Sequence, residues 1–570
     1  MATTSIQNLN KPKDAFEQLE DEEGTRQGFC HIRIQQRTGR KTITTVQGVA
    51  PEYDLKKIVR YLKKVRLSSC HLSAQLRRLL SRREVLHMSM VSVARLILAI
   101  VKMWSEHRLL CVAVAFRLFN CLLVQTWFVP DEYFQAVEPA HRLAFGYGAL
   151  TWEWRQGIRS YVYPLFIALY YGVLRLTALD SRAAVVHGPK LLQALFGALG
   201  DIHLFKLAKR FQGEQEALWS LLVYWSTWFG FFCTPRTLGN SVETVLTLIG
   251  LYHYPWPAHL LKEDERQTRR KHTWLYIAVA ALAVLVRPTA VLFWAPLALW
   301  NLFRVRHPVA FVTRTCLPVA LPVFALSVYV DRVCYGRWLL SAWNFAAFNV
   351  FEGGSGHFGV HPWHWYLSNG LPSVLTVHII PIALGVYRSR NRVVLWLCVW
   401  YVLFHSVLAH KEHRFLLPIV PLLCLYGGSF VNRLASSQGG SKSDKQSHRR
   451  LLDSASLDAY WRLVSGRAKT ALGLLLLVNV PIAAYTGLMH QRGPLDVTKF
   501  VSERYASLSL ELRPDAAVWF LAPCHSTPFY SHVHANVSMR ALNCDPNLDH
   551  IPGYVDEADR FHDHPERWLE

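Results

Sequence analysis

Apolar runs of bilayer length recur along most of this chain and restrict what it can fold into. A helix that crosses a bilayer needs roughly 20 mostly apolar residues. Such runs occur at residues 109–128, 161–178, 190–208, 216–233, 237–254, 273–301, 308–331, 371–387, 393–409, 415–432 and 469–489. The alternation typical of outer-membrane barrels is not seen. The sequence therefore predicts an all-α polytopic membrane protein with about eleven transmembrane helices.

Positive charge is concentrated outside these runs and predicts how the chain is oriented. The net charge is +22, and residues 56–83 alone hold ten Lys and Arg before the first run. Smaller basic clusters lie at 262–272 and 388–392. The positive-inside rule assigns all three clusters to the cytosol, so the loop at 129–160 is expected in the lumen.

The simplest explanation of the basic N-terminal block is topogenic: its charge keeps the N-terminus in the cytosol. Binding to anionic lipid headgroups is a second role open to it. It shows neither aromatic interleaving nor a recognised module, so nucleic acid is not expected as a partner.

The chain divides into three parts by composition. Residues 1–107 form a basic cytosolic extension, 108–490 form the membrane domain, and 491–570 form a polar C-terminal region expected in the lumen. Residues 1–50 lack an apolar core of signal-peptide length, so the first apolar run is expected to act as an internal anchor. Residues 436–450 are rich in Gly, Ser and Lys and are typical of a flexible linker.

The C-terminal region carries two features that depend on its compartment. Cys524 and Cys544 would form a disulfide in the lumen or remain two free cysteines. Asn536 begins an Asn-Val-Ser glycosylation sequon, which is usable only on the lumenal side. Residues 516–534 alternate in a way that favours a small strand-bearing unit.

A dense polar stretch follows the first apolar run and is the expected place of chemistry. Pro130, Asp131 and Glu132 form a helix-start pattern, because proline suits the first helical position and acids suit the first turn. Helix capping alone would explain these acids. Ionisable groups beside a bilayer are nevertheless costly and usually functional. On a helix the two acids point about 100° apart, so one would act as a base while the other orients a partner or caps the helix.

Further polar and aromatic residues lie within the same thirty positions. Candidates to hold a sugar or acceptor are Gln135, Trp152, Glu153 and Arg159. Aromatic rings combined with acids and amides suit a sugar ring, although an interfacial tryptophan belt has the same composition.

A second polar cluster, His-Ser-Val-Leu-Ala-His-Lys-Glu-His-Arg-Phe-Leu-Leu-Pro at 405–418, lies between two apolar runs. It is open to two interpretations. As a cytosolic loop it would only set topology. As an anion clamp, His410, Lys411 and Arg414 would hold a phosphate, with arginine able to bind it through two parallel hydrogen bonds. Glu243 and Arg287 are charged residues inside apolar runs, where charge is costly, but the sequence does not assign their roles.

Four motifs in order resemble the dolichol-phosphate-mannose-dependent mannosyltransferases of glycosyltransferase family 22, which have the GT-C membrane fold. They are VPDEYFQAVEPAH, GYGALTWEW with IRSYVYP, RTLGNSVET and AHKEHRFLLPIVP, and they span residues 129–421. Within the family, Phe128-Val129-Pro130, the LTWEW block and the tail APCHSTPFYSHVH are most similar to members that add the third mannose of the glycosylphosphatidylinositol (GPI) core in α1,2 linkage.

This resemblance implies an inverting α-mannosyltransferase of the endoplasmic reticulum (ER) membrane. The donor would be dolichyl-phosphate mannose and the acceptor a GPI precursor lipid. A single displacement needs one base, for which Asp131 is the first candidate and Glu132 the second, and it needs stabilisation of the departing phosphate by His410, Lys411 and Arg414. The lipid phosphate is already activated, so no nucleotide, metal or other cofactor is expected.

Other functions compete with this prediction. A sister enzyme of the family would act on the dolichol-linked N-glycan precursor instead. A lipid or solute transporter would show inverted repeats, which are not evident here. A non-catalytic subunit would be expected to have lost the acid pair, which is intact at Asp131 and Glu132.

Overall fold

The structure is a computed structural model. It describes residues 31–37, 41–47, 106–263, 273–354, 356, 359–436, 464–509, 511–513, 515–548 and 551–569. The chain divides into two units, Met1–Arg83 and Glu84–Glu570. In the first unit, β1 (His31–Arg37) pairs antiparallel with β2 (Lys41–Gln47). The basic block at 56–83 and most of the predicted linker at 436–450 lie outside the described residues.

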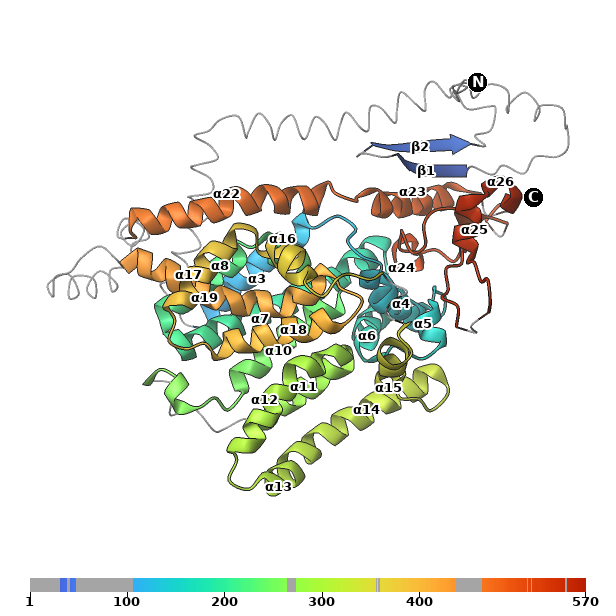
Figure 1. The fold of residues 1–570 in the computed structure, drawn as a ribbon. Helices are drawn as coiled ribbons and strands as arrows, with labels where there is room; N and C mark the ends of the chain where they lie inside the picture. The colour runs from blue at the N-terminus through green and yellow to red at the C-terminus, as the bar shows by residue number, and fades with distance from the viewer. Residues whose placement is uncertain are drawn as a thin grey trace, which may run out of the picture. The chain divides into compact units, whose positions relative to one another are not determined.

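The second unit is helical almost throughout (Figure 1). Its first elements are α3 (Glu106–Leu123), η2 (Tyr133–Val137), α4 (Glu138–Phe145), α5 (Trp152–Arg155), α6 (Val162–Leu176), α7 (Arg182–Gln212), α8 (Glu214–Trp225), α9 (Trp228–Cys233), α10 (Gly239–His253) and η3 (Ala258–Leu260). Next come α11 (Thr273–Val286), η5 (Pro288–Ala290), α12 (Val291–Arg304), α13 (Pro308–Phe311), η6 (Val312–Cys316), α14 (Leu317–Tyr335), α15 (Ser341–Ala346) and η7 (Ala347–Phe351). The membrane part ends with η9 (Tyr366–Gly370), α16 (Leu371–Leu375), η10 (Thr376–His378), α17 (Ile379–Arg388), α18 (Val393–Val407), η11 (His413–Ile419), α19 (Val420–Ser436) and α22 (Gly466–Leu488).

Local sequence signals set the length of α7, the longest single α-helix among the described residues. The Ser181 hydroxyl caps its start by accepting a hydrogen bond from the Ala184 N–H, and it ends where Gly213 adopts a positive φ of 107°. At about 1.5 Å per residue, its 31 residues cover roughly 46 Å. That length exceeds the apolar thickness of a bilayer, about 30 Å.

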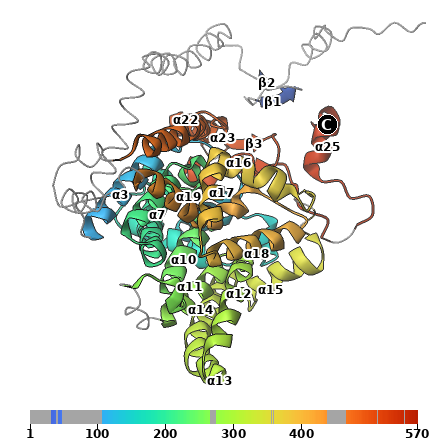
Figure 2. The same cartoon turned by 60° about the vertical axis from the view of Figure 1, so that its left-hand side comes forward.

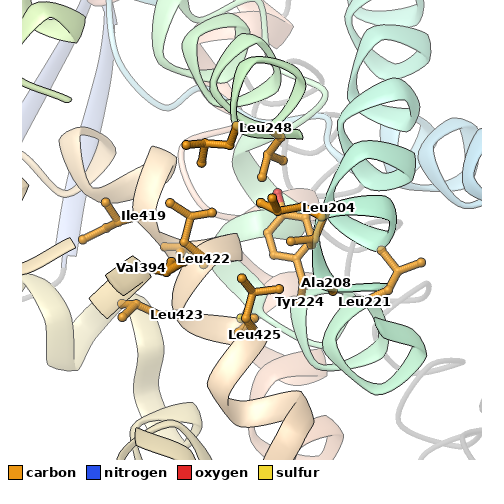
Figure 3. Close-up of a cluster of buried hydrophobic side chains, with 14 of the residues drawn as sticks. Leu204, Ala208, Leu221, Tyr224, Leu248, Val394, Ile419, Leu422, Leu423 and Leu425 are labelled. Atoms are coloured by element: carbon orange, nitrogen blue, oxygen red, sulfur yellow. The ribbon is translucent and has the colours of Figure 1, made fainter. Parts of the chain in front are cut away.

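The helices around α19 pack closely because small residues lie at their crossings. A Cβ atom on Gly428 would come within 2.3 Å of Ser220 Cα in α8, and one on Gly385 within 2.0 Å of the Tyr426 carbonyl oxygen. Small residues let membrane helices approach closely. Figure 3 shows the apolar core formed there, with side chains from α7, α8, α10, α18 and α19 meeting between the helices.

The described residues contain five helical segments long and apolar enough to cross a membrane, judged by length and composition. They are Arg182–Gln212, Pro308–Tyr335, Tyr366–Arg388, His413–Ala435 and Gly466–Ser507. Shorter apolar helices cover Val162–Leu176, Thr273–Val286 and Val393–Val407. A multi-pass helical membrane protein is therefore confirmed, while the count of about eleven spans stays a prediction.

The periphery of the helical body is formed by two groups of helices. In both views α13 and α14 project from the body, and α22 lies along one side of it (Figures 1 and 2). α14 packs mainly against α11, and α22 packs against α9 and α19.

The C-terminal region is a small mixed unit that sits beside the polar loop. Its elements are α23 (Gly493–Ser507), β3 (Ala517–Phe520), α24 (Tyr530–Val533), β4 (Ser538–Ala541), α25 (Glu557–Asp563) and α26 (Pro565–Leu569). β3 and β4 are parallel. β3 lies within residues 516–534, where the sequence predicted a strand-bearing unit, and β4 follows them. Cys524 and Cys544 form a disulfide, which resolves the two alternatives left open by the sequence. α24 contacts α4 and α7, so the chain end closes over the loop that follows the first membrane helix.

Candidate active site

The polar loop folds as a helix, as its start pattern predicts. Helical residues begin at Asp131, and the Tyr133 and Phe134 N–H groups donate to the Pro130 carbonyl. The turn is a π-helix over η2 and continues as α4. Because Asp131 and Glu132 occupy adjacent positions at the start of this helix, their carboxylates leave it in different directions.

Asp131 faces the second polar cluster. Its Oδ2 lies 2.5 Å from Nη1 of Arg414, in an ion pair where the aspartate side chain is 23% exposed and the arginine 7%. Two motifs far apart in the sequence therefore share one site. Since the loop at 405–418 meets Asp131 directly, both lie on the same side of the membrane. The compartment in which this shared site lies stays a prediction.

Glu132 points away from this partly open site into the protein. Its Oε2 lies 2.7 Å from Nη1 of Arg236, and both side chains are fully buried. The same Nη1 donates to the Thr126 carbonyl at 2.7 Å, and Thr237 Oγ1 donates to the Glu132 carbonyl at 3.0 Å. This enclosed network fixes the helix that presents Asp131. Of the two roles predicted for the acid pair, Glu132 has the geometry of the orienting one.

Within the basic cluster, only part of the charge is directed at Asp131. Arg414 also holds Glu412 through Nε at 2.7 Å, and Glu412 accepts a 2.8 Å contact from His410. Burial alone would raise the pKa of Glu412, but Arg414 and His410 outweigh it and lower that pKa below its ordinary value. Lys411 is buried, and its Nζ donates to the His361 carbonyl at 2.9 Å and to the Leu408 carbonyl. Lys411 therefore ties the loop together, whereas Arg414 is the member that meets Asp131.

Three of the four predicted sugar-binding residues, Gln135, Glu153 and Arg159, form one connected group. Glu153 Oε1 lies 2.6 Å from Nη2 of Arg159, and Glu153 Oε2 accepts from Gln135 Nε2 at 3.3 Å. The charge of Asp131 acts on Arg159 as well. Trp152 is buried with its ring 5.0 Å from that of Phe348. Trp152 therefore packs against its neighbours, whereas Gln135, Glu153 and Arg159 are the polar residues near Asp131.

The C-terminal region adds residues that the sequence did not single out. The His525 ring lies 4.8 Å from that of Phe134, and Asp131 and Glu153 are among the charges that act on it. Asp545, next to the disulfide, forms an ion pair with Arg155. Asn536 is exposed, as a glycosylation acceptor must be, and its modification stays a prediction. The sequence did offer one indication that the tail contacts the loop. The tail motif at 522–534 is rich in His and Ser, which is not typical of a linker.

Glu138 clamps this tail onto α4. Its Oε1 accepts from the Phe529 N–H at 2.7 Å, the Ser531 N–H at 3.1 Å and the Ser531 hydroxyl at 2.7 Å. The side chain is fully buried. Burial raises the pKa of Glu138 to about 7, although the hydrogen bonds from Ser531 and Phe529 oppose the shift.

The raised pKa of Glu138 predicts a pH-dependent stability. An acid whose folded pKa lies above its unfolded value of 4.5 stabilises the fold at low pH, and this contribution is lost as pH rises through about 7. The loss is of the order of 3 kcal/mol. Thermal unfolding of wild type and Glu138→Gln between pH 5 and 8 should give converging or crossing curves, because the amide does not titrate. If the substitution also destabilises the fold equally at every pH, the whole curve of Glu138→Gln is displaced. Parallel curves for the two proteins would contradict the raised pKa of Glu138.

Among the described residues, no group of three His, Cys, Asp or Glu side chains is placed to hold a metal ion, so none is assigned. The expectation that transfer requires no cofactor stays a prediction.

Comparison with known proteins identifies the family. The family model for Alg9-like mannosyltransferases matches residues 108–534, which contain the residues of the site described above except Asn536 and Asp545. The chain belongs to this mannosyltransferase family. It is 39% identical to GPI alpha-1,2-mannosyltransferase 3 of Mus musculus, over 80% of this chain and 77% of that protein. It is 36% identical to mannosyltransferase APTG1 of Arabidopsis thaliana, over 80% of each chain. The protein is thus a glycosyltransferase, and family membership with the helical architecture confirms the predicted all-α GT-C class.

Solved structures give a more distant comparison for this mannosyltransferase. It is similar to ArnT from Cupriavidus metallidurans bound to undecaprenyl phosphate, with 13% identity and a TM-score of 0.47, over 76% of this chain and 85% of that chain.

A second family model, translation initiation factor SUI1, matches residues 26–79 of this mannosyltransferase. The expectation that the N-terminal extension lacks a recognised module is therefore wrong for this segment. The match includes both described strands, β1 and β2, and much of the basic block at 56–83.

Proposed function

We propose that this chain transfers the third mannose of the GPI core, in α1,2 linkage, from dolichyl-phosphate mannose to the GPI precursor lipid. The names of relatives such as GPI alpha-1,2-mannosyltransferase 3 of Mus musculus and GPI mannosyltransferase 3 of Drosophila melanogaster support this acceptor. The observation that carries the proposal is the ion pair of Asp131 with Arg414. It brings a candidate base and a candidate phosphate ligand, from two separate motifs, to one partly open site.

In this proposal Asp131 and Arg414 exchange partners when the donor binds. The donor phosphate competes with the Asp131 carboxylate for the Arg414 guanidinium, which can bind it through two parallel hydrogen bonds. Asp131 is thereby released to accept the proton of the acceptor hydroxyl. The acceptor oxygen forms a bond to the anomeric carbon as the bond from that carbon to the phosphate oxygen breaks. Dolichyl phosphate leaves, and the sugar inverts.

The residues around this pair have supporting roles. Glu412 keeps Arg414 directed into the site through its 2.7 Å contact, and Glu132 fixes the start of the helix through Arg236. The connected group of Gln135, Glu153 and Arg159 supplies acceptors and donors for sugar hydroxyls. His410 holds Glu412 within the loop, and Lys411 ties the loop to the His361 carbonyl.

We further propose that the enzyme acts in the ER membrane. Its N-terminal extension would be cytosolic and the loop at 129–160 lumenal, in line with the positive-inside rule. The exposed Asn536 and the disulfide of Cys524 with Cys544 fit a lumenal C-terminal region.

Arg414→Lys tests the phosphate assignment. A lysine keeps the charge but loses the planar fork, so the apparent donor KM should rise about tenfold while the acceptor KM changes little. Mannose transfer to the GPI precursor is measured in purified membranes at several donor concentrations, with an N-glycan precursor as control acceptor. Unchanged donor kinetics would remove Arg414 from the phosphate site. Transfer to the N-glycan precursor instead would favour the sister activity.

A further inference from the structure

Two arginines flank the same aromatic ring at the edge of the proposed donor site. The guanidinium carbon of Arg414 lies 5.5 Å from the Phe415 ring centroid, and that of Arg287 lies 5.2 Å from it. The two positive charges are close enough to act on each other. Like charges kept together in a largely buried place cost free energy unless acids or an anion balance them. Asp131 and Glu412 balance Arg414, and Glu243 balances Arg287. The pair can therefore bind an anion only through N–H groups that these acids leave unused.

Arg287 lies between α11 and η5, and its donors are only partly used. Its Nη1 donates to Asn240 Oδ1 at 3.0 Å, and its Nη2 makes only a long 3.5 Å contact with Thr289 Oγ1. A guanidinium carries five N–H groups in a fixed fork. Donor capacity therefore remains on the side chain that shares Phe415 with Arg414.

Glu243 fixes the position of this arginine. Its Oε2 lies 3.1 Å from Nε of Arg287, and the carboxylate is 1% exposed. It is presented by α10, one turn after Asn240, so a single helix face holds the guanidinium at two points. An acid and a base inside a membrane helical body are costly and generally serve function. The proposed transfer by Asp131 and Arg414 does not account for this pair.

The chemistry of transfer has a need that a second arginine would meet. Bound donor is a phosphodiester with one negative charge, whereas the departing dolichyl phosphate is a monoester with a charge of about −1.5 to −2. Negative charge on the phosphate therefore grows as the sugar leaves. One arginine balances the donor, and a second becomes useful only in the transition state and product.

We propose that Arg287 is this second phosphate ligand and that Glu243 is its positioning residue. The inference rests on the proposed function, because it takes Arg414 as the first ligand of the same phosphate. It assigns the two arginines different kinetic roles. Arg414 holds the donor, and Arg287 stabilises the charge that develops on the leaving group.

The test compares kinetic constants and product inhibition of purified full-length enzyme. Arg287→Gln should lower kcat by about tenfold to a hundredfold while the donor KM changes by less than about threefold. Inhibition by added dolichyl phosphate should weaken by a similar factor, whereas uncharged dolichol should behave as with wild type. Arg287→Lys should recover part of the loss, and Glu243→Gln should give a smaller loss of the same kind. Arg304→Gln, an exposed arginine on the neighbouring helix α12, is the matched control and should match wild type.

Other outcomes separate failure of this inference from failure of the proposed function. If Arg287→Gln and Arg287→Lys lower only thermal stability, with wild-type kcat and wild-type inhibition by dolichyl phosphate in the folded fraction, the pair is structural and the inference is overturned. If Arg414→Lys also leaves donor KM and inhibition unchanged, the phosphate site itself is misplaced. If Arg287→Gln does not fold, inhibition of Arg287→Lys by dolichyl phosphate tests the inference instead. Lysine lacks the planar guanidinium, so it must still bind the phosphate dianion more weakly.

Discussion

Asp131→Asn should reduce mannose transfer by roughly a hundredfold or more while leaving the protein folded. The amide keeps the shape of the side chain but does not accept a proton from the acceptor hydroxyl. It also removes the charge that Arg414 contacts at 2.5 Å. The measurement is initial rate of transfer at saturating donor, with the amount of folded enzyme determined by size-exclusion chromatography.

The neighbouring acid is the control for this experiment. Glu132→Gln preserves a hydrogen-bond acceptor for Arg236 in the buried network, so its transfer rate per folded molecule should fall much less than that of Asp131→Asn. Activity of Asp131→Asn close to wild type would exclude it as the base. A rate loss confined to Glu132→Gln would move the assignment to that acid.

Arg236→Met should produce the largest loss of stability. It leaves the fully buried Glu132 carboxylate without its 2.7 Å partner. Removing one member of a buried ion pair typically costs about 3–5 kcal/mol, because an uncompensated charge remains in a low-dielectric interior. The expected result is a large drop in thermal midpoint and in the yield of folded protein in detergent.

The double variant Glu132→Gln with Arg236→Met separates the charge effect from packing. Because no uncompensated charge is left, it should recover a substantial part of the stability lost in Arg236→Met. A double variant no more stable than Arg236→Met would show that the Thr126 and Phe232 contacts of the arginine, and not its charge, stabilise this region.

The sequence was sufficient for features that depend on local pattern. Bilayer-length apolar runs predicted the helical class, and the helix start at Pro130 and Asp131 follows from backbone preferences of proline and acids. Arg236 was different. It lay within a motif used for the family resemblance, yet its partner Glu132 is 104 residues away, and no local pattern encodes such a tertiary pair.

The charge of the loop at 405–418 left two interpretations open. Its His, Lys and Arg residues suggested a cytosolic loop, but Glu412 holds Arg414 and His410, and Lys411 is bonded to backbone carbonyls. These partners lie in the folded structure and are not encoded by a count of charges along the sequence, and the compartment of the loop stays a prediction. The sequence also left the pairing of Cys524 with Cys544 open, because a disulfide depends on the distance between the two residues in the fold.

The clamp of Glu138 on the tail has a consequence for biosynthesis. The partners of this carboxylate lie 391 and 393 residues later in the chain. At about 5–20 residues per second, synthesis of that interval takes on the order of a minute. During that time the acids of the early loop lack their final covering, and a chain that stops before Phe529 never acquires it. A chain terminated before Phe529 should therefore lack the contacts that hold the tail against α4, although its proposed base was made hundreds of residues earlier.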